Sequence, residues 1–223
     1  VTVVALAEPD ESLRQAVLDR WNLECAGFSS LEEMLDGVEL DGVVVASPDR
    51  FHAESIKLCL SRKMPTLCEK PLAQSSEDAE ELSELAQQSL KDVGHPLVHL
   101  GFMRRFDPPF IEVKKLIDSG ELGAVLYVNA STRNVSSPGI KSTELLTNIA
   151  IHEVIWGDVT IVKNHEHPAH PAFALGENWI ARFRQAYVNE LLEWTKTLRG
   201  EASSSLATVE DGLRALQVLD GVR

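Results

Sequence analysis

The first hundred residues alternate between short apolar runs and segments with helical periodicity, which predicts strands separated by helices. Apolar runs predict strands at 1–7, 43–46, 66–68 and 97–102, and the first is of the kind buried on both faces of a parallel sheet. Helical periodicity covers 11–21, 51–62 and 75–90. A shorter helix is predicted after Ser30, where Glu33 three residues later forms a capping box. This order is typical of βαβ units.

The pattern changes after Phe102. A helix is predicted at 109–117, and residues 125–132 alternate apolar and polar side chains, as a strand with one solvated face does. Residues 144–162 have a helical pattern, and a loop rich in histidine and proline follows at 165–171. A long helix with an aromatic stripe is predicted from Trp179 to Leu198 and ends at Gly200, and a final helix covers 209–222.

The composition narrows the class of partner. The chain has 223 residues, 44% of them hydrophobic, which is enough for one large domain or two small ones. Its net charge of −13 repels nucleic acids and anionic membranes, so a neutral or weakly charged small molecule fits better. No apolar run approaches membrane-spanning length. Three cysteines without metal-ligand spacing are typical of a reduced, cytoplasmic chain.

Polar residues follow three predicted strands at their carboxyl ends, where open parallel sheets bind ligands. Glu8 follows the first strand, Ser47 and Pro48 follow the second, and Glu69-Lys70 closes the third. A carboxylate such as Glu8 can accept hydrogen bonds from the ribose of a dinucleotide and repels a 2′-phosphate, which favours NAD over NADP. Taken alone, Glu8 fits a solvated loop carboxylate before a helix better than a ribose ligand.

Lys70, between Glu69 and Pro71, has the chemistry for alcohol oxidation. An amine at a strand end can hydrogen-bond a substrate hydroxyl and stabilise the negative charge that develops on its oxygen. The alternative is a surface Glu–Lys pair, which contributes little. The position of the triplet in the order of strands favours the first interpretation.

Asn148 and His152 are four residues apart in a predicted helix, so they share one face. A histidine there can accept the proton that an alcohol loses as hydride leaves. The alternative is a core histidine that hydrogen-bonds a backbone carbonyl. Three further histidines in the 165–171 loop lack the spacing of a structural zinc site, so no metal site is predicted.

Together these motifs make the chain similar to the Gfo/Idh/MocA oxidoreductases, and within them to the inositol 2-dehydrogenase-like members. Their order and spacing match the family from 1 to about 162, and again from 179 to the end. The motifs, as they stand here, are Ala5-Leu6-Ala7-Glu8-Pro9-Asp10, Ala46-Ser47-Pro48 with His52, Cys68-Glu69-Lys70-Pro71-Leu72, Gly101-Phe102-Met103-Arg104-Arg105-Phe106-Asp107-Pro108, Arg133-Asn134, Ile151-His152-Glu153, and Arg182-Phe183 with Ala186-Tyr187.

The resemblance implies an α/β protein with two domains: a Rossmann-type domain at 1–103 and a C-terminal α/β domain at 104–223. The second would carry a mostly antiparallel sheet that builds a homo-oligomer interface. The cofactor would be NAD, lined by Glu8, Ser47, Pro48, His52, Glu69 and Lys70. The substrate would be bound by Lys70, Arg105, Asn134, Asn148 and His152. The catalytic residues would be Lys70, His152 and Asn148.

The sequence departs from the family pattern at three places. The family's first strand, glycine-rich loop and helix are absent before Val1, and most strands of its C-terminal sheet are missing between about 162 and 179. We therefore expect that the chain joins pieces of a longer polypeptide or is truncated. Without the loop that holds the pyrophosphate, cofactor affinity should be low. Asn148 replaces an aspartate of the inositol-type members and cannot supply the negative charge that stabilises an imidazolium.

Three functions stay open at this point, and one of them is a related chemistry of the family, such as aldose–aldose oxidation or biliverdin-type reduction. The leading hypothesis is an NAD-dependent dehydrogenase that oxidises a ring alcohol of a cyclic polyol or sugar, such as myo-inositol, to a ketone. The alternative is a non-catalytic homologue that binds a cofactor or metabolite, which Asn148 and the missing phosphate loop favour.

Overall fold

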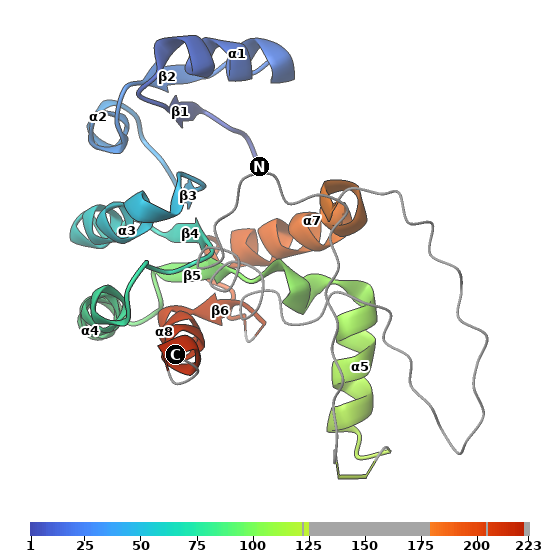
Figure 1. The fold of residues 1–223 in the computed structure, drawn as a ribbon. Coiled ribbons are helices and arrows are strands. Elements are labelled where there is room, and N and C mark those ends of the chain that lie inside the picture. The colour runs from blue at the N-terminus through green and yellow to red at the C-terminus, as the bar shows by residue number, and fades with distance from the viewer. Residues whose placement is uncertain (122, 125–178, 204, 221–223) are drawn as a thin grey trace.

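The computed structural model describes residues 1–121, 123–124, 179–203 and 205–220, which form two sheets flanked by helices (Figure 1). The first sheet consists of the parallel strands β1 (Ala5–Ala7) and β2 (Ala26–Phe28). The second has the order β3 (Val43–Val45), β4 (Thr66–Glu69), β5 (Val98–Gly101) and β6 (Ala207–Thr208). Strands β3, β4 and β5 are parallel, whereas β6 is antiparallel to β5. The predicted α/β class with a Rossmann-type parallel sheet is therefore confirmed.

The helices lie close to where the periodicity predicts them. They are α1 (Glu11–Trp21), α2 (Leu31–Gly37), α3 (His52–Ser61), α4 (Ser76–Val93), α5 (Pro108–Asp118), α7 (Trp179–Thr197) and α8 (Val209–Asp220). Two short 3-10 helices precede α3 and α5, namely η1 (Asp49–Phe51) and η2 (Met103–Phe106). The predicted strand at 125–132, helix at 144–162 and loop at 165–171 lie outside the described residues.

Side-chain caps explain why two helices begin where they do. The Ser30 hydroxyl accepts the Glu33 N–H at 3.1 Å, and the Ser75 hydroxyl accepts the Asp78 N–H at 3.1 Å. The Glu33 carboxylate returns to the backbone N–H of Ser29, one residue before the cap. The predicted capping box therefore forms with its second half shifted by one residue.

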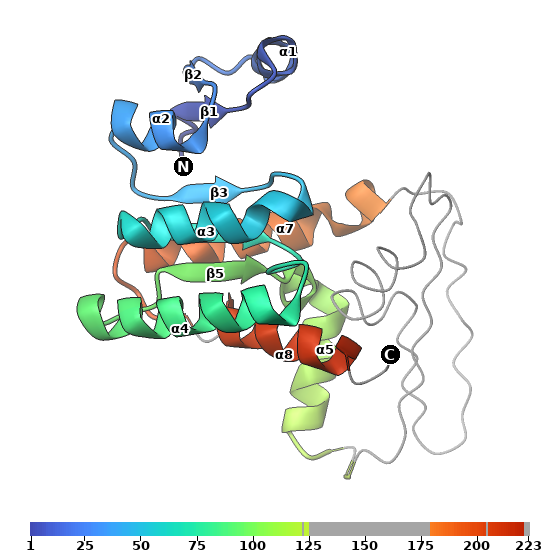
Figure 2. The same ribbon diagram turned by 60° about the vertical axis from the view of Figure 1, so that its left-hand side comes forward.

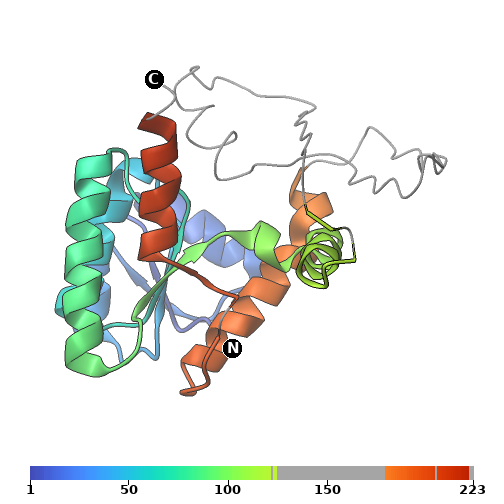
Figure 3. The ribbon, with the colours of Figure 1, turned by 90° about the horizontal axis from the view of Figure 1, so that it is seen from below.

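Helices cover both faces of the larger sheet (Figures 2 and 3). Helices α3, α4 and α8 lie on one face, and α7 lies on the other. The main core fills the first layer and includes Ile56, Leu82 and Leu100, all without exposed area. The second layer contains Leu67, Phe106, Trp194 and Leu206 against α7. This packing sets the carboxyl ends of β3, β4 and β5 at one edge of the sheet.

The prediction of a buried strand over residues 1–7 is wrong in extent and in burial. The strand is limited to Ala5–Ala7, and Val1, Val3 and Val4 are 96%, 51% and 42% exposed. Among the described residues β1 pairs with β2 alone, so its other edge has no neighbour to cover an apolar run. The adjacent α1 likewise has no buried residue, although its boundaries match the prediction.

The C-terminal segment adds a strand that the sequence pattern did not reveal. Strand β6 has two residues, too few for any periodicity to appear. Ala207, Val209, Leu213 and Leu216 belong to the same core cluster as β3, β4 and β5. The division into domains at 103/104 stays a prediction. No helix in the described part of the chain is both long and apolar enough to cross a bilayer.

Gly212 is expected to be required for the packing of α8. A Cβ at this position would lie 2.9 Å from Leu72 Cβ and closer still to Leu100. We expect Gly212→Ala to destabilise the protein by about 1–2 kcal/mol, since overpacking outweighs the gain in helix propensity of about 1 kcal/mol. Urea unfolding measures the change, with Gln217→Ala on the exposed face of α8 as control. An unchanged or higher stability of Gly212→Ala contradicts the prediction.

Candidate functional site

The imidazole of His52 joins the carboxyl ends of β3 and β4. Its Nδ1 lies 2.7 Å from the carbonyl oxygen of Pro71, and its Nε2 lies 2.8 Å from the carbonyl oxygen of Ser47. Ser47 follows β3, and Pro71 follows β4 after a cis Lys70–Pro71 bond. The ring is 1% exposed. The structure therefore brings the segments that follow both strand ends, at Ser47 and at Pro71, against one buried side chain.

The Glu69 carboxylate folds back over β5. Its Oε2 accepts the backbone N–H of Lys70 at 3.3 Å. Gly101 is the register partner of Glu69, and a Cβ added to it would lie 3.2 Å from the same oxygen. The absence of a side chain at Gly101 thus leaves room for the carboxylate above the sheet. Lys70 follows at the point where the strand leaves the sheet.

A second carboxyl group lies on the same side of the sheet, on α7. Glu190 is 2% exposed, and its Oε1 has no hydrogen-bond partner among the described residues. Burial, and then the negative charge of Glu69, raises the pKa of Glu190 to about 9. The group is therefore neutral at pH 7. Sequence reasoning assigned it no role, although a carboxylate on the apolar face shared with Phe183 and Trp194 was a visible signal.

The residues present fit part of an NAD molecule. The Ser47 hydroxyl is buried without a hydrogen-bond partner among the described residues, so it is available to a ligand amide or hydroxyl. Glu8 directly follows β1, and its carboxylate accepts the Asp10 N–H at 3.0 Å and retains acceptor capacity for a ribose.

The pyrophosphate is not accounted for by the same residues. The strand-to-helix turns at 8–10, 29–30, 46–51 and 70–75 contain no glycine. A tight backbone cradle for phosphate is therefore not among these four described turns. Glu8 also follows a strand of the smaller sheet, whereas Ser47 and Lys70 follow strands of the larger one.

The predicted substrate residues are described only in part. Arg105 on η2 is held by Asp211 of α8, with its Nη1 3.2 Å from Oδ2 and its Nη2 3.2 Å from Oδ1. This bidentate pair fixes the direction of the guanidinium. Asn134, Asn148 and His152 lie outside the described residues, so their predicted roles stay predictions.

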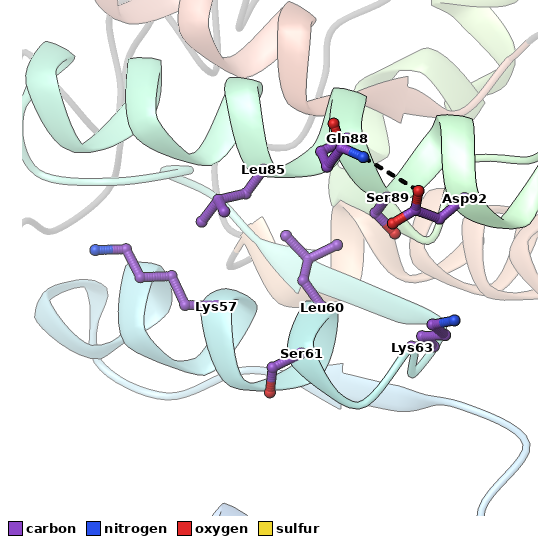
Figure 4. A pocket seen from close by; sticks show the side chains of 8 residues that line it. All are labelled: Lys57, Leu60, Ser61, Lys63, Leu85, Gln88, Ser89 and Asp92. Atoms are coloured by element: carbon purple, nitrogen blue, oxygen red, sulfur yellow. Dashed lines mark hydrogen bonds between the residues drawn. The ribbon is translucent and has the colours of Figure 1, made fainter.

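A small cavity away from the strand ends is a weaker candidate for a ligand site. It lies between the C-terminal halves of α3 and α4 and has a volume of about 200 Å³ (Figure 4), below the usual range of about 300–1,000 Å³ for ligand pockets. It is lined by Lys57, Leu60, Ser61, Lys63, Leu85, Gln88, Ser89 and Asp92. None of these is a predicted site residue, and α3 has by then run back toward the amino end of β4.

The described cysteines and metal-binding residue types form no further centre. Cys59 and Cys68 are buried, and burial raises the pKa of both thiols, which suits core residues rather than nucleophiles. Among the described residues no group of three histidine, cysteine or acidic side chains could hold a metal ion. His165, His167 and His170 lie outside that part of the chain.

Comparison with known proteins shows which family the chain is similar to. Residues 1–94 match the sequence model of the Gfo/Idh/MocA oxidoreductase family, described as having an NAD-binding Rossmann fold. The chain is 39% identical over 122 residues to inositol 2-dehydrogenase 2 of Saccharopolyspora erythraea, covering 54% of this chain and 35% of that one. It is 35% identical over 153 residues to inositol 2-dehydrogenase of Rubrobacter xylanophilus, covering 68% and 42%. The chain thus spans less than half the length of these relatives.

Solved structures share the fold. The myo-inositol dehydrogenase of Lactobacillus casei, crystallised with NAD(H) and myo-inositol, superposes with a TM-score of 0.74 at 19% identity, covering 96% of this chain and 84% of that one. A putative myo-inositol dehydrogenase of Sinorhizobium meliloti gives 0.78 at 18% identity, covering 98% and 87%. These likenesses confirm the architecture, and the sequence match confirms the resemblance: residues 1–94 match the model of the Gfo/Idh/MocA oxidoreductase family.

Proposed function

We propose that the chain provides the strand-end chemistry of an NAD-dependent dehydrogenase that oxidises a ring alcohol of a cyclic polyol, such as myo-inositol, to a ketone. The observation that carries the proposal is the position of Lys70. It lies at the carboxyl end of β4, and His52 joins that end to the Ser47 turn of β3. The sequence similarity to inositol 2-dehydrogenases supports the choice of substrate class.

Lys70 has one defined task in this reaction. Its ammonium group donates a hydrogen bond to the alcohol oxygen and stabilises the negative charge that grows there as the proton leaves. Bound NAD supplies the acceptor for the hydride that leaves the carbinol carbon. His152 takes the hydroxyl proton, and Asn148 orients His152 or the substrate; both assignments rest on the family resemblance. Glu8, at the adenosine end, favours NAD over NADP because a 2′-phosphate would meet its carboxylate.

Turnover with a panel of cyclic polyols tests the proposal. We expect NAD reduction with myo-inositol, followed by the absorbance of the reduced cofactor, and weaker or no reduction with NADP. Absence of reduction with every polyol and sugar tried would overturn the proposed activity.

A second candidate is a homologue that binds the cofactor or a metabolite without turning it over. Asn148 and the glycine-free turns after β1, β2, β3 and β4 favour it. Its signature is thermal stabilisation by NAD or a polyol with no accompanying reduction.

We also propose that the protein acts as a cytoplasmic homo-oligomer. One face of α7 carries the exposed apolar residues Val188, Leu191 and Leu192, which a partner subunit would cover. The three cysteines, all in the described part of the chain, are free thiols, as suits a reducing compartment. Light scattering after size-exclusion chromatography tests the oligomer, and a monomer at all concentrations would contradict it.

A further inference from the structure

His52 has both of its polar atoms engaged by backbone. The two ring nitrogens meet the carbonyl oxygens of Pro71 and Ser47 at 2.7 and 2.8 Å, and the ring is 1% exposed. A ligand that contacted this ring through a polar atom would have to displace one of these carbonyls. A role in direct cofactor contact therefore agrees poorly with the geometry.

The two carbonyls belong to segments that are distant in sequence. Ser47 lies 5 residues before His52, and Pro71 lies 19 residues after it. Each segment carries a polar group at the carboxyl edge of the sheet: the Ser47 hydroxyl on one, and Lys70 on the other. The ladder between β3 and β4 ends at Val45 and Cys68, so beyond that register the imidazole bridges the two segments.

We propose that His52 is a positioning residue that holds the Ser47 and Pro71 segments together, so that the Ser47 hydroxyl and the Lys70 amine reach the same bound molecule. This inference rests on the proposed dehydrogenase function for the identity of that molecule. The bridge itself rests on the two contacts alone.

The shape of imidazole explains why histidine suits this position. The two ring nitrogens point in different directions from a rigid ring, so each can lie within hydrogen-bond distance of a different carbonyl oxygen. A ring with one proton donates to one carbonyl, and an imidazolium donates to both. A glutamine of similar size offers its donors from one nitrogen only, and a leucine offers none.

The variants His52→Gln and His52→Leu test the bridge, with a control on the same helix. Ile56 lies one turn further along α3 and has no exposed area. The control is Ile56→Val or Ile56→Ala, chosen so that its loss of stability in urea unfolding equals that of His52→Leu. We expect His52→Leu to lower kcat/KM by about 10- to 100-fold, because small displacements of reacting groups cost that much. His52→Gln should fall between it and the wild type, and the Ile56 control should stay near the wild type. An equal loss in His52→Leu and the control would overturn the inference.

Amide hydrogen exchange decides the same question without turnover. In His52→Leu we expect faster exchange at 47–51 and at 69–74 together, and no such change in the Ile56 control. Loosening of neither segment, or of only one, would overturn the bridge. If none of the polyols supports NAD reduction by the wild type, the proposed function fails. The exchange result still shows whether His52 couples the two segments, so the two failures can be told apart.

Discussion

Lys70→Met is expected to lower kcat for polyol oxidation by about a hundred- to a thousandfold, the usual loss when a donor to a developing oxyanion is removed. Methionine keeps most of the length of the side chain and removes the charge, so the change isolates the hydrogen bond to the alcohol oxygen. Steady-state kinetics with saturating NAD and polyol measure it, and KM for NAD should change far less than kcat.

Lys91→Met is the matched control for this substitution. Lys91 is an exposed residue in the last turn of α4, on the outer layer of the fold. Turnover should be unchanged in this variant. If Lys70→Met and Lys91→Met behave alike, the assignment of Lys70 to the reacting hydroxyl is wrong.

Glu190→Gln is expected to remove a pH-dependent loss of stability. Burial, with the charge of Glu69 added, raises the pKa of Glu190 from 4.5 to about 9 in the folded protein. Between these values the unfolded chain has released the proton and the folded protein still holds it, so stability falls as pH rises. The slope is about 1.4 kcal/mol per pH unit, and from pH 5 to pH 8 the wild type should lose about 4 kcal/mol relative to the variant.

Urea unfolding at pH 5, 6.5 and 8 measures this difference. Glu193→Gln, less than one turn further along α7, is the control. Its partner Lys196 lowers the pKa of Glu193, so that group affects stability only at more acidic pH. Parallel stability curves for the wild type and Glu190→Gln would show that Glu190 is ionised in the folded protein.

His99 has the opposite effect on the acidic side. Burial, and to a lesser extent His95, lowers the pKa of His99 on β5 from 6.5 to about 4. The folded protein therefore resists binding a proton that the unfolded chain takes up, and stability is lost as pH falls from 6.5 toward 4. Between pH 4.5 and 6.5 the contributions of His99 and Glu190 oppose each other, so the alkaline decline becomes visible above about pH 6.5.

The sequence pattern predicts the helices and strands of this fold better than it predicts their burial and their pairing. Helix α1 begins and ends as predicted, strands β3 and β5 fall within the predicted apolar runs, and β4 extends one residue beyond its run, to Glu69. The burial of residues 1–7 could not be predicted in the same way, because burial depends on what lies at the far edge of β1. Strand β6 is too short for a pattern, and only its partner β5 defines it.

The site was predictable as motifs and not as contacts. Glu69, Lys70 and Ser47 were predicted as site residues because strand ends recur in order along the chain. The bridge by His52 could not be found, because its partners are backbone carbonyls, which leave no mark in the side-chain sequence. For Glu190, the neighbouring charge of Glu69 comes from a strand more than a hundred residues earlier, and no local pattern contains it.

Strands β1 and β3 each have a single partner among the described residues. Val4, which precedes β1, is 42% exposed, and Val44, within β3, is 50% exposed. An open strand edge offers N–H and C=O groups to any extended chain that approaches, including another copy of the same protein. The net charge of −13 keeps copies apart while its field extends beyond the surface. Salt shortens that field to about 8 Å at physiological ionic strength. We therefore expect aggregation to increase with ionic strength, and charged substitutions at Val4 or Val44 to delay it.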